Sequence, residues 1–137
     1  MNKKIIIIVV AVLLVAGGAA FFLLGNSKKE PVMYKHLYDP EQMVTNIKEG
    51  KHLLKTAIVL EVETKKKELD DKTLKLLDSQ KIQMRDIMNS ILKAKTLTEL
   101  ESDEIKDKLR NEIVTALKKE LELDILVTIY YNDFVIQ

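Results

Sequence analysis

The sequence predicts an α+β fold, with one N-terminal transmembrane helix followed by a small domain that has an antiparallel sheet and helices on one face. Three observations support this. Residues 5–24 contain no charged side chain. Residues 52–63 alternate in polarity and are rich in β-branched side chains, which is typical of a strand. Residues 82–95 and 103–119 carry apolar side chains three and four positions apart, which is typical of helices.

The uncharged run at residues 5–24 has the length of a transmembrane helix. Twenty helical residues extend about 30 Å, which matches the hydrocarbon core of a bilayer. A cleaved signal peptide is the alternative, because Lys3 and Lys4 precede the run and residues 16–20 are small. The apolar run continues through residues 21–24, which favours an uncleaved anchor. The chain has no cysteine, which excludes a lipoprotein anchor.

The apolar run divides the chain into predicted segments. We expect a short cytoplasmic tail at residues 1–4, the transmembrane helix at 5–24, a polar linker at 25–33 and an exported domain at 34–137. Two lysines precede the run and two follow it, so the flanking charges nearly balance. A short basic tail stays inside easily, which favours a cytoplasmic N-terminus and a domain outside the plasma (inner) membrane. The short linker should hold that domain close to the bilayer.

The charge balance excludes some kinds of partner. Of the 22 basic residues, Lys3 and Lys4 lie before the apolar run, which leaves 20 basic residues against 21 acidic ones. A net charge of about −1 gives no electrostatic basis for binding nucleic acid. It gives none for a polybasic membrane-surface domain either.

The domain should begin with strands. Residues 32–38 alternate imperfectly and end at an Asp-Pro step, and residues 43–47 form a short extended segment. Gly50 marks a turn, because glycine adopts the positive φ that tight turns need. Residues 52–63 then form the clearest strand, with the even positions 54–62 on one face, and should pair with 43–47 as a hairpin.

Helices should follow. Residues 66–77 are charged and helix-favouring, and with 82–95 they form either one long helix or two helices broken near residues 78–79. Thr98 and Glu101 have the spacing of a capping box. Ser102 is a second candidate cap, followed by acidic residues at the start and basic residues at the end of the helix at 103–119, an arrangement that suits the helix dipole.

The chain ends in an apolar segment, residues 124–137. Ile125, Val127, Ile129 and Tyr131 should share one face of a strand. An exposed apolar edge favours aggregation, so we expect an interior strand paired with the earlier hairpin. The predicted order is β-β-β-α-α-β.

Reactive side chains are scarce. His36 and His52 are the only histidines and lack metal-ligand spacing, and no serine lies in a G-x-S-x-G turn. The acidic residues 68–71 lack the spacing of a calcium loop and suit a solvated helix start. We therefore predict no catalytic, cofactor-binding or metal-binding residue and no cofactor, and we expect a binding or structural protein rather than an enzyme.

Several short motifs occur in a recognisable order along the chain. They are Asp39-Pro40, V-T-N-I at 44–47, the predicted strand at 54–62, Arg85-Asp86 in the predicted helix at 82–95 with Lys95-Thr96 at its end, K-x-x-L-x-x-E-I at 106–113, and Y-x-D-F-V-x-Q at 131–137. With this ordered set the chain resembles the flagellar basal body-associated protein FliL family over its whole length. The acidic run after residue 62 and the brief linker depart from that pattern.

The resemblance implies a single-pass inner-membrane protein with an exported domain of the stomatin/prohibitin type. It implies no catalytic activity. The implied partners are flagellar stator units, other basal body components and further copies of the chain in a ring, which would support flagellar rotation, chemotaxis and swarming. Strand edges or polar helix faces are the expected ring contacts.

Two other functions compete with this one. The first is a membrane-tethered structural adaptor of another envelope complex, such as one for secretion or sporulation, which would share both anchor and fold. The second is an exported enzyme, which would need converging polar side chains in a cleft.

Overall fold

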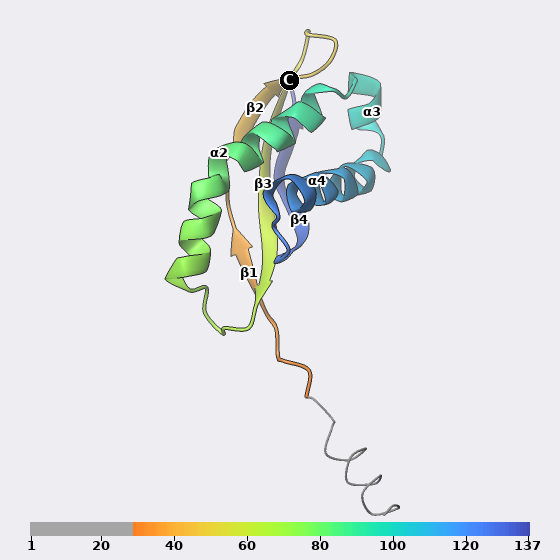
Figure 1. Ribbon diagram of the computed structural model, residues 1–137. Coiled ribbons are helices and arrows are strands. Elements are labelled where there is room, and N and C mark those ends of the chain that lie inside the picture. The colour runs from red at the N-terminus through yellow and green to blue at the C-terminus, as the bar shows by residue number, and fades with distance from the viewer. Residues whose placement is uncertain (1–28) are drawn as a thin grey trace, which may run out of the picture. The chain divides into compact units, whose positions relative to one another are not determined.

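The described part of the protein is a four-stranded antiparallel sheet with helices on one face (Figure 1). This computed structural model describes residues 29–137, so the predicted membrane helix at 5–24 lies outside the described residues. Within 29–137, no helix is both long and apolar enough to cross a bilayer. The elements are β1 (Tyr34–Tyr38), β2 (Met43–Asn46), β3 (Leu53–Thr64), α2 (Asp71–Lys93), α3 (Leu97–Glu101), α4 (Ile105–Leu121) and β4 (Leu126–Ile136).

Strand β3 is the centre of the sheet. On one side it pairs with two short strands in turn, because β2 pairs with residues 53–56 and β1 with residues 60–64. On its other side it pairs along most of its length with β4. The predicted hairpin of 43–47 with 52–63 is confirmed, and Gly50 in its turn has φ 69°. Strand β4 pairs with β3 alone among the described strands, so its predicted interior position is wrong.

The core lies between the sheet and the two long helices. The side chains of β3 at the even positions 54–62 are all fully buried, as the alternation predicted. They pack with Leu77, Met84, Met88 and Leu92 from α2 and with Leu109, Ile113 and Leu117 from α4. The predicted apolar stripes of both helices are therefore confirmed as core.

Helix α2 is a single helix with no break near residues 78–79. It begins after Asp70, whose carboxylate accepts a hydrogen bond from the Thr73 backbone N–H at 2.7 Å. An ion pair with Lys66 and this bond hold the pKa of Asp70 well below its usual range. The acidic residues 68–71 thus lie at a helix start, as expected, and one of them is its cap.

The observed order of elements in residues 29–137 is β-β-β-α-α-α-β, which contains a short helix, α3, that the predicted order β-β-β-α-α-β lacks. Its capping box joins Thr96 and Glu99 rather than Thr98 and Glu101. Glu99 N–H donates to Thr96 Oγ1 at 3.2 Å, and Thr96 N–H donates to the Glu99 carboxylate at 2.7 Å. Both pairs have T-x-x-E spacing, but Thr96 has the extended backbone that an N-cap needs. Ser102 ends α3, and α4 begins after Glu104 without a side-chain cap.

Two bulges in β4 change which of its side chains face the helices. The register with β3 shifts between Ala57 and Ile58 and again between Glu61 and Val62, and each shift leaves one β4 residue unpaired. As a result Leu126 and Ile129 are both buried although they are three positions apart. The predicted simple alternation from residue 125 to 131 is therefore wrong.

Candidate interaction surface

The face of the sheet that α2 and α4 leave uncovered is the main candidate for a functional surface (Figure 1). We call it the open sheet face. It consists of the odd-numbered side chains of β3 from 53 to 63 and the side chains beside them on β1, β2 and β4. The large apolar side chains on it are Leu37, Val44, Leu53, Val59, Tyr130 and Val135.

These apolar side chains are accessible to solvent. Leu37 is 64% exposed and Val44 is 60% exposed, while Leu53, Tyr130 and Val135 are each between 42% and 45% exposed. The solvent face of an antiparallel sheet usually carries polar side chains. Apolar side chains gathered on one surface, rather than scattered singly, mark a site of contact with another protein or a membrane.

A buried carboxylate lies within the open sheet face. Glu61 is only 7% exposed. Its carboxylate lies 3.0 Å from Lys35 Nζ of β1 and accepts a hydrogen bond from the Tyr130 hydroxyl of β4 at 2.7 Å. The Tyr130 hydroxyl, and then Lys35, lower the pKa of Glu61. These contacts join three strands across the face and keep the charge compensated, without which burial would be costly.

Replacing Glu61 with glutamine should lower the free energy of unfolding by about 1–2 kcal/mol at pH 7, the cost of a lost charge-assisted bond. The folded-state pKa of Glu61 is below its unfolded value, so its contribution is present above the unfolded pKa of about 4.3 and lost as pH falls through the folded pKa. The difference from wild type should therefore shrink at about pH 3. Urea denaturation at both pH values measures this.

The matched control for that change is Glu63→Gln, two positions along the same face. Glu63 is more exposed and makes no ion pair within residues 29–137. Its replacement should cost well under 1 kcal/mol at either pH. Equal losses for the two variants, or a Glu61→Gln loss of the same size at pH 3 and pH 7, would contradict the proposed role of the carboxylate.

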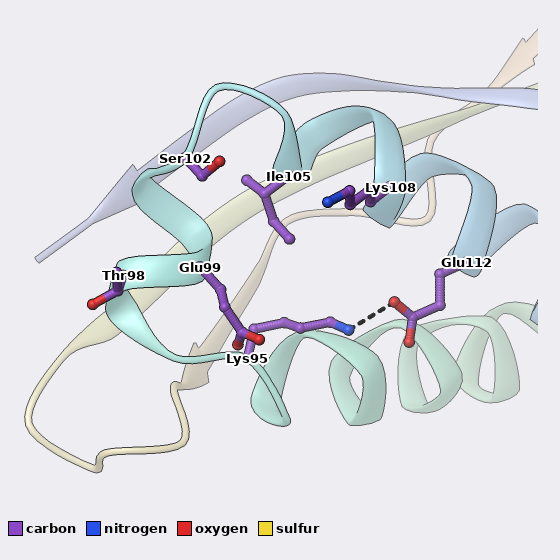
Figure 2. Close-up of a pocket in the computed structure, with 7 residues that line it drawn as sticks. All are labelled: Lys95, Thr98, Glu99, Ser102, Ile105, Lys108 and Glu112. Carbon is purple, nitrogen blue, oxygen red and sulfur yellow. Dashed lines mark hydrogen bonds and ion pairs between the residues drawn. The ribbon is translucent and has the colours of Figure 1, made fainter.

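A pocket of about 430 Å³, lined mostly by charged and hydroxyl-bearing residues, lies where α3 and α4 meet the end of α2 (Figure 2). Its charged groups already have partners. Lys95 Nζ contacts the Glu112 carboxylate at 2.7 Å, and Glu99 belongs to the capping box of α3. These contacts stabilise the junction of the helices, and the pocket contains no nucleophile paired with a base.

Both histidines have structural positions rather than positions in a reactive site. His36 Nε2 lies 3.1 Å from both Thr64 Oγ1 and the Lys66 carbonyl, so it ties β1 to the end of β3. His52 is half-buried just before β3. Among residues 29–137, no group of three or more acidic, histidine or cysteine side chains could hold a metal ion.

The motifs at 39–40 and 85–86 meet in space although they are 45 residues apart. Arg85 of α2 donates from Nη1 to the Pro40 carbonyl at 3.0 Å and from Nη2 to the Gln42 carbonyl at 3.2 Å. Glu41, between these carbonyls, has φ 75° and forms an ion pair with Lys81. We call these contacts the Arg85 clamp. The clamp fixes the connection between β1 and β2.

The family model of the flagellar basal body-associated protein FliL matches residues 37–137, which extend from within β1 to the residue after β4. The chain belongs to the FliL family. It is therefore related to a structural component of the flagellar basal body, and the family is not known for enzymatic activity. No curated protein matches the chain.

Membership of the FliL family gives the ordered motifs a structural meaning. V-T-N-I at 44–47 is the last three residues of β2 and the residue after it, and the motif at 54–62 is most of the central strand β3. The motif at 131–137 is the second half of β4 and the residue after it. The open sheet face was not predicted as a site. The sequence signal was present in Leu37 and Val44, which are apolar at positions that the strand alternation turns away from the core.

Proposed function

We propose that this FliL-family protein is a non-catalytic accessory of the flagellar motor that associates with the ion-driven stator units and supports rotation and swarming. It is anchored in the plasma membrane by residues 5–24, has a cytoplasmic tail at 1–4 and a linker at 25–33, and holds the domain at 34–137 outside. The family match carries the basal-body assignment. The open sheet face supports a role in protein contacts.

The length of the linker supports a role close to the membrane. Nine residues span at most about 30 Å when fully extended. An apolar face on a domain held at that height can contact the extracytoplasmic parts of neighbouring membrane proteins. Stator units and further copies of this chain are the proposed neighbours.

Deletion of the gene tests the motor role directly. We expect reduced swarming and fewer stator units at the motors, measured by tracking cells and by counting fluorescent stator subunits. Expression of the full-length protein should restore both. Normal motility together with normal stator recruitment in the deletion strain would defeat the proposal.

Purification of the full-length protein from membranes separates the motor role from an adaptor role in another envelope complex. Stator and basal body proteins should co-purify with it. Recovery of secretion or sporulation components instead would favour the adaptor.

A reporter fused after Gln137 tests the topology, because an enzyme that folds only outside the cytoplasm should be active there.

A further inference from the structure

We propose that the turn between β3 and α2 docks on anionic lipid headgroups at the bilayer surface, through Lys65 and Lys67. We call residues 65–68 the basic turn. The proposal rests on the membrane anchor and the short linker of the proposed function, because they set which end of the domain meets the bilayer. It adds to that function a lipid contact that fixes how the domain tilts.

The basic turn lies where the chain enters the domain. Tyr34, the first residue of β1, pairs with Thr64, the last residue of β3, and the basic turn follows directly. The C-terminus lies at the opposite end of the sheet, because Gln137 exchanges two backbone hydrogen bonds with Leu53 at the start of β3 (Figure 1). The 12 residues of β3 span roughly 40 Å, so a short linker leading into β1 keeps the basic turn on the bilayer side.

The backbone of the basic turn is fastened to the sheet. His36 Nε2 of β1 lies 3.1 Å from the Lys66 carbonyl, and the Lys66 N–H donates to Thr64 Oγ1 at 3.3 Å. The ammonium group of Lys66 forms an ion pair with Asp70, the N-cap of α2. The turn is therefore held in place before it meets a ligand, which lowers the entropy that binding would cost.

Two lysines of the basic turn are free to bind phosphate groups. Lys65 and Lys67 are exposed and make no ion pair or side-chain hydrogen bond in the described part of the chain. Of the nearby acids, Asp70 is already paired, and Asp71 lies in the first turn of α2, where the helix dipole favours negative charge. Glu68 is then one free acid against two free lysines. The balanced charge of the whole domain confines the lipid contact to this turn.

Two exposed apolar residues lie at the same end of the domain. Val32 and Met33, just before β1, are 67% and 44% exposed. Binding to a bilayer surface strengthens both with the apolar area buried and with attraction to anionic lipids. Docking of the basic turn would bring these two side chains to the headgroup layer and remove them from water.

The other turn at this end of the domain is acidic. The α4–β4 turn, residues 122–125, lies beside the end of β3, because the Glu63 N–H donates to the Ile125 carbonyl at 2.8 Å. Its exposed charges are Glu122 and Asp124. An anionic bilayer attracts the basic turn and repels the acidic one. The domain should therefore tilt so that its β1 side lies closer to the headgroups than the α4–β4 turn.

Fluorescence quenching in reconstituted vesicles tests the docking, and the chain has no native cysteine to interfere. A fluorophore is attached to Glu68→Cys in the full-length protein, and the quencher is a nitroxide carried on a lipid headgroup. The vesicles contain phosphatidylcholine alone or phosphatidylcholine with anionic phosphatidylglycerol. Quenching should be strong in the anionic vesicles and should weaken without phosphatidylglycerol or at high salt, which screens the attraction.

Reporters at two matched sites separate docking from tethering. Asp124→Cys also removes an acid from an exposed turn at the linker end, and Glu49→Cys removes one from the turn between β2 and β3 at the far end. In anionic vesicles, quenching should be strongest for Glu68→Cys, weaker for Asp124→Cys and weakest for Glu49→Cys. Tethering alone would quench the two reporters at the linker end equally.

Removing the two lysines should release the turn. In the Glu68→Cys background, Lys65→Gln with Lys67→Gln should lower the ratio of docked to undocked protein on the order of tenfold. The matched control is Lys48→Gln with Lys51→Gln, which removes the same charge from the far turn and should leave that ratio unchanged. All four lysines are exposed, so an unchanged thermal unfolding temperature is expected and would show that the domain still folds.

Two results would overturn the docking. One is quenching at Glu68→Cys that does not depend on lipid charge, and the other is quenching that survives the loss of both lysines. Flotation of the protein with the vesicles is measured in the same samples. Protein that floats without lipid-dependent quenching would leave the anchor in place and reject the docking, while protein that fails to float would overturn both. Docking in a protein whose deletion leaves motility normal would support the lipid contact and count against the motor role.

Discussion

Replacing Leu60 with alanine should lower the free energy of unfolding by about 2–5 kcal/mol, the range for removing a large buried side chain. Leu60 is fully buried in the central strand, with Tyr38 of β1 and Ile129 of β4 beside it. The cavity would lie between the sheet and both helices, where neighbouring strands hold the backbone and limit its collapse. Because small domains are stable by only about 5–15 kcal/mol, the melting temperature should fall markedly.

Leu37→Ala is the control for that change, because it removes the same atoms from the other face of the sheet. Leu37 is 64% exposed, so little packing is lost and the cost should be within about 0.5 kcal/mol. Thermal and urea denaturation of both variants in detergent, followed by circular dichroism, measures the difference. Similar losses for the two leucines would mean that the assignment of the two faces is wrong.

The fold elements that could be predicted are those whose local pattern and tertiary role agree. In β3 the even positions 54–62 are buried because helices cover that face, and the alternation of the sequence reports this directly. Strand β4 could not be predicted in the same way. Its two bulges arise from pairing with β3, and no local sequence pattern predicts them. Likewise, α3 is only five residues long, too short to show a helical period.

The candidate surface was not predicted from the sequence. Leu37 and Val44 lie at positions that pairing with β3 turns away from the core, but the sequence does not say whether another element covers them. The bond network of Glu61 depends on Lys35 and Tyr130, which lie 26 and 69 residues away. The Arg85 clamp joins residues that are 43 and 45 positions apart. The sequence therefore shows both motifs but not the contact between them.

Arg85→Met should lower the free energy of unfolding by about 1.5–3 kcal/mol, the value for losing hydrogen bonds from a charged donor. Methionine keeps the length of the side chain but cannot donate to the carbonyls of Pro40 and Gln42. The strained backbone at Glu41 would lose the contacts that hold it. The change should also act locally, so hydrogen exchange should accelerate in β1 and β2 more than in β4.

Two further variants separate the guanidinium geometry from its charge. Arg85→Lys keeps the charge, but a single ammonium group cannot reproduce the two-pronged donation to both carbonyls, so it should recover only part of the loss. Lys81→Met removes the ion pair to the exposed Glu41 and should cost clearly less than Arg85→Met, because solvent weakens such pairs. If Arg85→Lys matched wild type, charge alone would hold the β1–β2 connection. If Lys81→Met cost as much as Arg85→Met, the carbonyl contacts would not be what holds the β1–β2 connection.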